Sequence, residues 1–363
     1  MKIYLVGGAV RDELLGKPVQ ERDWVVVGST PEEMIAKGYQ PVGKDFPVFL
    51  HPKTHEEYAL ARTERKTGKG YKGFHFYATP DVTLIDDLIR RDLTINAMAK
   101  HKITGEIIDP HGGRNDLAKK ILRHVSPAFA EDPVRILRVA RFASMLPDFT
   151  VDPSTNELMR QMVKSGEVDA LVAERVWKEL SRALLTENPQ RFFEVLKNCD
   201  ALGILFPEFS PKLKWELNLF ALNHAIKMTG DGTVRFAALL HHLSRDEIQS
   251  ICKRFRVPSE FSELALLLAK FFDAYQKLDP KNPEQLLFIL KSIDAFRRPE
   301  RFNAWMMTCH AIDATHNHAK ILLCALHAAK TVDLQPLLDQ KIQGKAFADA
   351  LHELQLDAIA KLK

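Results

Sequence analysis

Few cysteines and no long apolar run limit the classes of protein to which this 363-residue sequence can belong. Its four cysteines form no CxxC pair, so neither a disulfide framework nor a cysteine-based zinc site is expected. No stretch of about 18 uninterrupted apolar residues occurs, which argues against a membrane span. The short apolar start followed by Gly7 and Gly8 does not form a secretory signal. We therefore expect reduced thiols and a cytoplasmic protein.

A strong surplus of charge of one sign is also missing. Lys and Arg number 51 against 47 Asp and Glu, which leaves a net charge of +4. So small a surplus permits a polyanionic partner but does not establish one. What is present, 46% hydrophobic and 27% charged residues, is typical of a globular protein rather than a disordered one. At about 100–200 residues per domain, the length predicts two or three domains.

The sequence changes character near Asp109-Pro110. Before it, short β-prone runs alternate with turns and short helices, including a helix over Ala9–Leu15 and a helix start at Ser29–Glu33. The expected strands are Lys2–Val6, Trp24–Val27, Phe46–Leu50, Glu57–Ala61 and Gly105–Ile108. From Leu122 onward, apolar residues recur three and four apart, with proline or glycine breaks between helices. We therefore predict an α+β protein, with an α/β head on a long helical body.

Gly7 and Gly8 lie between a predicted strand and a predicted helix. Two glycines there let the backbone approach a ligand closely, and a helix start favours phosphate. Arg11, one turn further, would add a bidentate contact. A tight turn that needs glycine only for its dihedral angles explains the same residues, and the pattern matches neither of the common nucleotide-binding glycine motifs.

Glu21 and Asp23 stand two residues apart at the entry to the Trp24–Val27 strand. At that spacing both carboxylates project to one face and can converge on one cation. Hard oxygen ligands beside a phosphate-binding turn suit Mg²⁺, which keeps water and substrate phosphates in its shell. Acidic pairs more often mark a solvated strand end. The order of glycine turn, short helix and paired acids favours the metal.

Arg90, Arg91 and Asp92 begin a third motif that runs to Ala97. The apolar spacing of Leu88–Met98 predicts a helix, with Arg91 and Asn96 outside the core. Adjacent arginines suit contacts to a triphosphate or a ribose, and a surface face of salt bridges is the alternative.

A fourth motif places Asp132, Arg135, Arg138 and Arg141 three residues apart, with Asp132 as the predicted N-cap and Pro133 as the first helical residue. An acid and an arginine on one helix face can offer an acceptor and donors to the Watson–Crick edge of a base. A basic helix face exposed to solvent or RNA is the alternative. The regular spacing opposite an apolar stripe favours ligand contact.

The basic, glycine-rich stretch Arg62–Gly73 is predicted to be a mobile loop that closes on nucleotide or RNA. A solvated hairpin tip would have the same composition.

Together and in this order, the motifs closely resemble those of the class II tRNA nucleotidyltransferases, the CCA-adding enzymes and their bacterial poly(A) polymerase relatives. The resemblance is specific over residues 1–145 and continues to about 207, through Glu174–Glu179 and Leu205–Glu208. The multifunctional CCA enzymes of gamma-proteobacteria look nearest. The family fold implies a polymerase-beta-like head with a mixed sheet over residues 1–140, a helical neck over 141–207, and a helical, tRNA-binding body and tail over 208–363.

The resemblance implies a nucleotide-binding set made of Gly8, Arg11, Arg90, Arg91, Asp92, Asp132, Arg135, Arg138 and Arg141. Within it, Gly8 and Arg11 would hold the triphosphate, Arg90 to Asp92 the ribose and phosphates, and Asp132 with Arg135 would select CTP and then ATP. Glu21 and Asp23 would be the catalytic ligands of Mg²⁺, and Glu57 is a candidate third carboxylate.

Two departures from the family pattern stand out. The paired metal acids of the family are normally both aspartate, whereas the first is Glu21 here, which reaches one methylene further and would still bind Mg²⁺ with altered geometry. The segment Arg235–Leu243 looks like the place where multifunctional members carry a His-Asp metal motif, but His242 replaces the acid beside His241. We therefore expect no metal-dependent phosphohydrolase activity.

The sequence thus predicts an enzyme that adds CCA to tRNA 3′ ends from CTP and ATP without a template, with tRNA, CTP and ATP as partners, no membrane contact, and either a monomer or a homodimer. An enzyme restricted to A addition or poly(A) tailing is one alternative. A non-catalytic RNA-binding protein on the same scaffold is the other, motivated by Glu21 and by the altered His-Asp segment.

Overall fold

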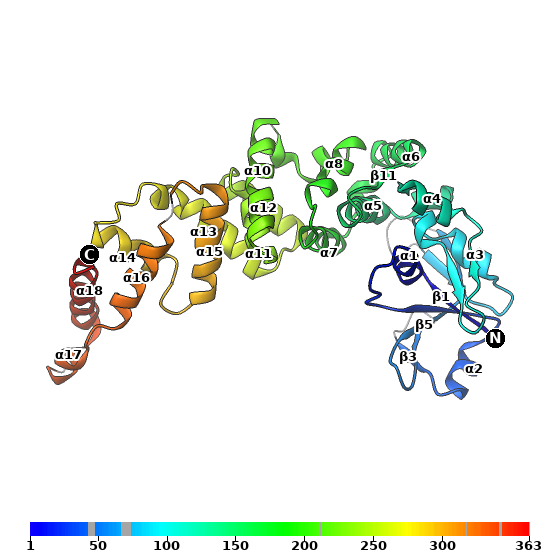
Figure 1. Ribbon diagram of the computed structural model, residues 1–363, viewed down its shortest axis with the longest axis horizontal. Helices are drawn as coiled ribbons and strands as arrows, with labels where there is room; N and C mark the ends of the chain where they lie inside the picture. The colour runs from blue at the N-terminus through cyan, green and yellow to red at the C-terminus, as the bar shows by residue number, and fades with distance from the viewer. Residues whose placement is uncertain (43–47, 67–73, 211, 317, 341–342, 363) are drawn as a thin grey trace. The chain divides into compact units, whose positions relative to one another are not determined.

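The structure is a computed structural model that describes residues 1–42, 48–66, 74–210, 212–316, 318–340 and 343–362. The chain divides into two compact units, Met1–Leu205 and Phe206–Lys363, whose elements are labelled in Figure 1. The head and the neck expected from the sequence both fall in the first unit. Because the arrangement of the units relative to each other is not determined, each is described by itself.

A mixed sheet forms the core of the first unit, with the described strands in the order β3-β4-β5-β2-β1-β8-β9. They are β1 (Lys2–Val6), β2 (Asp23–Val27), β3 (Gln40–Val42), β4 (Val48–Leu50), β5 (Glu57–Leu60), β8 (Ala99–His101) and β9 (Ile107–Ile108). The β2–β5 pair is parallel and the other neighbouring pairs are antiparallel. The register places Val6 opposite Asp23, and Asp23 opposite Glu57. The end of β1 and the starts of β2 and β5 therefore meet at one edge of the sheet.

Alternation along the strands gives this sheet two apolar faces. The face that includes Val25 packs against α3 (Leu84–Ile89), and the face that includes Val26 packs against α2 (Pro31–Ala36). Because residues two apart share a face, Asp23 lies on the side that α3 covers. The edge with Asp23 is thus close to the residues that follow α3, which begin with Arg90 and Arg91.

Most of the strands and short helices expected in the head are found, although the last strand is shorter than predicted and covers only Ile107–Ile108. The Lys2–Val6 strand is found as predicted, the second strand begins one residue early at Asp23, and α1 covers Gly8–Leu14. The hydroxyl of Thr30 caps α2, as its sequence indicates. Of the predicted first hairpin strand, residues 46 and 47 lie outside the described residues.

The predicted helix over Leu88–Met98 is wrong. The helix α3 ends at Ile89, and Thr94–Asn96 form a single 3₁₀ turn. Between them, Leu93 forms a β-bridge with His124 and the Thr94 amide donates to the Arg123 carbonyl, so pairing with a distant segment overrides local helical spacing. In consequence Asn96 is buried, contrary to the expectation from a helix.

The predicted loop over Arg62–Gly73 is only partly a loop. Its first part forms the strand β6 (Thr63–Lys66), which pairs with β7 (Phe74–Tyr77) in a separate two-stranded sheet. Residues 67–73 lie outside the described residues.

The rest of the first unit is helical around α5. Its helices are α4 (Gly113–Lys119), α5 (Val134–Met145), α6 (Pro153–Lys164), α7 (Ala173–Leu184), α8 (Gln190–Asn198) and α9 (Leu202–Leu205). The helix α5 packs against both α7 and α8 (Figure 1). A short parallel pair, β10 (Ile121–Leu122) with β11 (Thr150–Val151), departs from the all-helical expectation for this part. Strand pairing between such short segments is not visible in helical periodicity.

In its described part, the second unit is helical. The helices are α10 (Lys212–Met228), α11 (Gly232–Leu240), α12 (Arg245–Phe255), α13 (Ser259–Gln276), α14 (Pro283–Ser292), α15 (Pro299–Ile312), α16 (Ala319–Lys330), α17 (Gln335–Asp339) and α18 (Gly344–Ala360). The helix α11 packs against α10, α13 and α15, while α14, α16 and α18 pack together. The predicted fold class, an α+β head followed by helices, is confirmed.

One described stretch, Ala319–Asp339, is long and apolar enough on average to count as a candidate membrane span. The expectation of no span was based on uninterrupted apolar runs, which an average over a window does not require. In the structure α16 and α17 are separate helices, and the 12 residues of α16 extend about 18 Å, against about 30 Å for a bilayer core. A single such stretch is weak grounds for a membrane contact.

Candidate active site

The turn after β1 brings glycine backbone next to an arginine of the third motif. Gly7 has a positive φ of 72°, and a Cβ atom built on it would lie 3.1 Å from Nη1 of Arg91. A side chain at this position would be strained by its backbone conformation and crowded by the guanidinium. The first and third motifs, separated by more than 80 residues, therefore meet at the glycine turn.

Three carboxylates stand at the edge of the sheet beside this turn. Asp23 and Glu57 are directly opposed on the parallel strands β2 and β5, and Glu21 lies two residues before Asp23, outside the strand. All three residues are exposed. Burial by surrounding protein nevertheless raises the pKa of Asp23 by more than the neighbouring Arg91 lowers it, and the negative charge of Glu21 raises it further. The two predicted metal ligands are thus close enough for the charge of Glu21 to act on Asp23.

A buried acid fixes the two arginines. Asp87, on α3, accepts hydrogen bonds from Nη2 of Arg90 at 2.6 Å and from Nη2 of Arg91 at 3.0 Å. Burial works to raise the pKa of Asp87, but the two arginines outweigh it and the pKa is lowered. In the described part of the chain, Nε of Arg91 is buried without a hydrogen-bond partner. The Arg91 guanidinium is therefore tethered at one end and turned towards Gly7 and Asp23 at the other.

A chain of buried hydrogen bonds joins the first, third and fourth motifs. Arg11 donates to Asp12 at 2.8 and 2.9 Å and to Oδ1 of Asn96 at 2.8 Å. Asn96 donates to Asp92 at 3.1 Å, and Asp92 accepts from Nε of Arg138 at 2.6 Å. Burial works to raise the pKa of Asp92, but Arg138 and the bonds from Asn96 and the Leu93 amide hold it well below its usual range. The predicted direct contacts of Arg11 and Asp92 with nucleotide stay predictions, since both side chains are buried and engaged here.

The residues predicted to read the nucleobase are each held by other groups. Asp132 is bound by both Nη atoms of Arg175, at 3.1 and 2.8 Å, and accepts from the Val134 amide. Arg135 donates to the carbonyl oxygens of Ala128 and Arg90. The helix α5 begins at Val134, one position later than predicted, while Asp132 has an extended backbone and accepts from the Val134 amide, which is the hydrogen bond of the predicted N-cap.

Phe142 is the centre of a cluster of guanidinium groups. Those of Arg11, Arg138 and Arg141 lie 5.2, 5.6 and 4.4 Å from the centre of its ring. Arg141 is itself buried and bonded to Glu179 of α7, and burial lowers its pKa. Asp92 raises the pKa of Arg138. The arginine of the glycine turn and those of α5 thus share one aromatic surface.

Three residues around this site were not singled out from the sequence. Asp87 has a readable signal, since it stands three and four residues before Arg90 and Arg91 on a helix. Asn96 was placed on the surface by the wrong helix prediction. Arg175 was noticed only as part of a family-like segment, because its bond to Asp132 spans 43 residues of sequence.

The carboxylates at the sheet edge fit a hard divalent cation. In the part of the chain that the structure describes, no hydrogen bond or ion pair involves the carboxylates of Glu21, Asp23 or Glu57, and the like charges of the first two are unfavourable together. The described residues hold no group of three or more His, Cys, Asp or Glu side chains placed around one metal position. A cation here would therefore have few protein ligands and complete its shell with water and phosphate oxygens, which is the habit of Mg²⁺.

The comparisons with known proteins identify the family. Residues 3–123 match the family described as the Poly A polymerase head domain, and residues 148–213 match the probable RNA and SrmB-binding site of polymerase A. A CCA-adding enzyme from Coxiella burnetii is 54% identical over 363 residues, which cover 100% of this chain and 96% of the relative. The chain belongs to the CCA-adding enzymes. A multifunctional CCA protein from Thioalkalivibrio sulfidiphilus is 47% identical over 405 positions, covering 100% of this chain and 99% of the relative.

Solved structures share the fold of this CCA-adding enzyme. A Thermotoga maritima CCA-adding enzyme complexed with tRNA superposes with a TM-score of 0.75 at 22% identity, covering 100% of this chain and 88% of that one. A tRNA-processing enzyme with CTP gives a TM-score of 0.71 at 25% identity, with 99% and 97% covered. The predicted nucleotidyltransferase head and the helical remainder are therefore those of the family.

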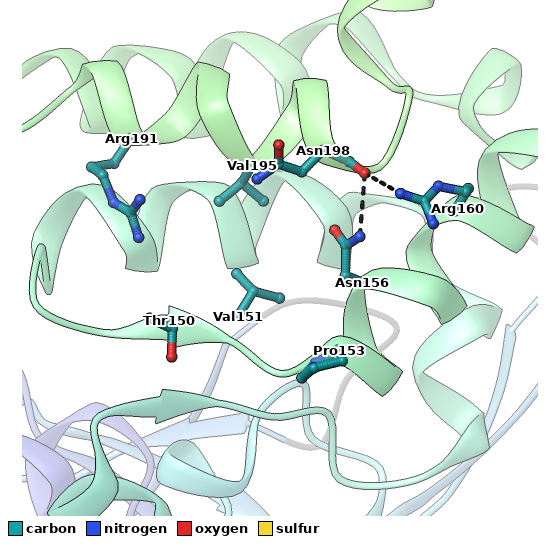
Figure 2. A pocket seen from close by; sticks show the side chains of 8 residues that line it. All are labelled: Thr150, Val151, Pro153, Asn156, Arg160, Arg191, Val195 and Asn198. Carbon is teal, nitrogen blue, oxygen red and sulfur yellow. Dashed lines mark hydrogen bonds between the residues drawn. The ribbon is translucent and has the colours of Figure 1, made fainter.

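One pocket of the CCA-adding enzyme lies apart from these motifs. It has a volume of about 400 Å³, and Figure 2 shows its lining residues Thr150, Val151, Pro153, Asn156, Arg160, Arg191, Val195 and Asn198. Asn156 and Arg160 both donate to the carbonyl oxygen of Asn198. Each arginine is also paired with an acid, Arg160 with Glu157 and Arg191 with Glu194. Its charges are balanced within the protein, and none of the predicted site residues lines it.

The altered His-Asp segment falls at the end of α11, in the second unit. The rings of His241 and His242 have centres 3.8 Å apart. Burial and then the neighbouring His242 lower the pKa of His241 to about 4, although its bond to the Ala238 carbonyl opposes this. The absence of phosphohydrolase activity stays a prediction, to be tested with the enzyme.

Proposed function

We propose that this CCA-adding enzyme builds and repairs the 3′-terminal CCA of tRNA from CTP and ATP, without a nucleic-acid template and with release of pyrophosphate. The observation that carries the proposal is the meeting of the glycine turn, Asp23 and Arg91 at one edge of the sheet. The Coxiella burnetii relative, named a CCA-adding enzyme, matches the chain over its whole length. The solved structures of relatives hold CTP, ATP and tRNA according to their descriptions.

The acids at the sheet edge would hold Mg²⁺, and Asp23 is the principal ligand in this proposal, with Glu21 and Glu57 beside it. Bound there, Mg²⁺ supplies activation of the tRNA 3′-hydroxyl and charge neutralisation on the departing pyrophosphate. Glu21 has a longer side chain than aspartate, so its carboxylate can reach the same point from a position outside β2. Burial raises the pKa of Asp23, so protons compete with the metal for this carboxylate at a higher pH than for an ordinary aspartate.

The positive groups around the glycine turn would receive the triphosphate. The guanidinium of Arg91 is tethered by Asp87 through Nη2 and brings Nη1 to the glycine turn, where it would contact phosphate oxygens. Gly8 lets the Arg11 guanidinium lie against the backbone, since a Cβ atom there would be 3.3 Å from Nη2, and Arg11 is held by Asp12 and Asn96. In phosphoryl transfer the protein acts mainly by positioning the two substrates and by stabilising the negative charge of the transition state.

The start of α5 would select the base. Asp132 is an acceptor of hydrogen bonds only, and Arg135 is a donor only. Cytosine at C4 and adenine at C6 carry an amino group that donates to a carboxylate, whereas uracil and guanine carry a carbonyl oxygen at these positions. Arg138, next to Asp92, and Arg141, next to Glu179, supply the positive surroundings of this site.

The test is the incorporation of labelled CTP and ATP into three RNAs: tRNA that ends before CCA, tRNA that ends in CC, and unrelated RNA. We expect C, C and A on the first, A alone on the second, and nothing on the third. An enzyme restricted to A addition would label only the CC-ended tRNA, and a poly(A) polymerase would extend unrelated RNA. A binding protein would retain tRNA with a steep salt dependence and release no pyrophosphate.

Asp23→Ala tests the metal site within the same assay. Removing the principal ligand should lower incorporation by about a thousandfold or more, while the fold and tRNA binding persist. Asp148→Ala is the matched control, because the side chain of Asp148 is 72% exposed and pairs only with Lys120 among the described residues. Full activity in Asp23→Ala would overturn the metal assignment.

We also propose the cytoplasm as the compartment of this enzyme, since CCA addition requires access to the tRNA pool and the free thiols of Cys199 and Cys309 are buried and reduced. Fractionation of cells that express the tagged chain tests this directly.

A further inference from the structure

The helix α7 presents two opposite charges to the nucleobase-selecting helix. Arg175 binds Asp132 and, one turn later on the same face of α7, Glu179 binds Arg141. The two helices pack directly against each other. None of the predicted site residues lies on α7, although this helix binds Asp132 just before α5 and Arg141 on α5.

The Asp132–Arg175 contact has the geometry that fixes a carboxylate. Both Nη atoms of the guanidinium engage the two carboxylate oxygens, Nη1 with Oδ1 at 3.1 Å and Nη2 with Oδ2 at 2.8 Å. Two parallel bonds prevent rotation of the carboxylate about its χ2 axis, which a single bond does not. The Val134 amide gives Oδ1 a second donor at 3.1 Å.

This arrangement leaves Asp132 partly available. Oδ1 accepts from two donors, whereas Oδ2 accepts one bond in the described structure and keeps a lone pair. The side chain of Asp132 is 19% exposed and that of Arg175 is 30% exposed, so the pair lies at the surface of the site rather than in the core. A base could add to this carboxylate without displacing Arg175.

We propose that Arg175 is a specificity-determining positioning residue, which acts through Asp132 and makes its carboxylate a fixed acceptor for the amino group of cytosine or adenine. The inference rests on the proposed function, since it assigns base selection to Asp132. Because the two Nη atoms of Arg175 hold it, the Asp132 carboxylate presents one oxygen in a fixed direction. The carbonyl oxygen of uracil or guanine cannot form a hydrogen bond with this oxygen, since both are acceptors. A freely rotating carboxylate would tolerate water between itself and the wrong base.

The test is Arg175→Ala in the full chain, assayed on tRNA that lacks CCA with CTP, ATP, UTP and GTP separately. We expect kcat/KM for CTP to fall about tenfold, through KM more than kcat, because a partly exposed ion pair that fixes a ligand contact is worth on that order. Discrimination of CTP over UTP should fall by a similar factor. Arg175→Lys keeps the positive charge but cannot form two parallel hydrogen bonds. It should therefore regain less than half of the discrimination that Arg175→Ala loses.

Two controls separate this role from a structural one. Arg182→Ala removes an exposed arginine of the same helix and should leave the discrimination as in the wild type. In an Asp132→Ala background, Arg175→Ala should cause no further loss of discrimination, because its effect passes through that carboxylate.

The outcomes are distinct. Absence of any incorporation by the wild type overturns the proposed function itself. Incorporation by the wild type with unchanged discrimination in Arg175→Ala overturns the role of Arg175 alone. An equal fall in kcat for all four nucleotides, accompanied by a lowered thermal midpoint, would show a merely structural brace and overturn it too.

Discussion

The two units of this enzyme differ in what they bury. The interior of the first unit holds charged side chains on several elements: Arg11, Asp87, Asp92, Asp116, Arg135, Arg141, Asp152 and Glu179. Among the described residues of the second unit, Arg235 is the buried charged side chain, beside the neutral Asn218, Thr308 and Gln355. Arg235 donates to the carbonyl oxygens of Thr229 and Ile226, at the end of α10.

The first unit is the part of the molecule in which buried charges lower stability but fix the orientation of side chains. Burying charges is unfavourable unless they are paired, and an apolar core of the same volume is often more stable. The first unit nevertheless keeps the chain from Arg11 to Arg138, which orients groups at the glycine turn and at α5. The second unit packs apolar helix faces and has no comparable buried network in its described part. The groups that the proposed reaction uses therefore lie in the unit that keeps buried charges.

The largest expected effect comes from Asp92→Ala, which breaks the buried network of the first unit. It leaves Nε of Arg138, the amide of Leu93 and the side chain of Asn96 without their acceptor. We expect the free energy of unfolding to fall by about 3 kcal/mol, as for other broken buried pairs. Denaturant titration measures the loss, and hydrogen exchange of residues 84–98 locates it.

Asp273→Ala, on α13, is the control for this variant, because the side chain of Asp273 is 75% exposed and pairs with Lys277. A loss below about 1 kcal/mol in Asp92→Ala would mean that the two units do not differ in the way described.

The next effect is the loss of folding stability at low pH, which occurs over a different pH range in each unit. His241 has a pKa of about 4 in the folded second unit, against about 6.5 for an unfolded chain. Because the folded protein favours neutral His241, the histidine stabilises the fold above pH 6.5. This contribution to the free energy of unfolding is lost as the pH falls from 6.5 to 4. The loss is up to about 3 kcal/mol. In the first unit, the lowered pKa values of Asp87 and Asp92 preserve stability until the pH falls below that of an ordinary carboxyl.

Denaturant unfolding at pH 7 and pH 4.5 measures this difference, with His241→Gln expected to flatten the dependence. His327→Gln replaces an exposed histidine on α16 and should keep the dependence of the wild type. If the free energy of unfolding fell equally from pH 7 to pH 4.5 in His241→Gln and in the wild type, His241 would not be the group responsible.

The smallest effect is expected from the surface ion pairs of the second unit. Glu263→Ala removes the partner of Arg298 and Arg301, both at 2.9 Å. Glu263 is 43% exposed, and solvent screens such pairs, so the free energy of unfolding should change by less than about 1 kcal/mol. A loss comparable to that of Asp92→Ala would remove the contrast between the units.

Local elements of the head follow from short-range signals. Thr30 and Pro31 predict the start of α2, and the β-prone run Lys2–Val6 predicts β1, because caps and alternation act within a few residues. The helix expected over Leu88–Met98 fails for a physical reason: its Leu93 and Thr94 pair with a segment about 30 residues away. Local periodicity contains no information about that partner.

The sequence by itself determined the family, the order of the motifs and the chemical types at the site, since the identities of Asp23, Arg91 and Asp132 are enough to indicate acids for a metal, a cation for phosphate and an acceptor for a base. Only the tertiary structure decided how these groups are held. Arg91 is tethered by Asp87, Arg11 is joined to α5 through Asn96, and Asp132 is fixed by Arg175. A carboxylate or guanidinium takes its orientation from its partners, and those partners come from distant segments that meet only when the sheet and the helices have packed.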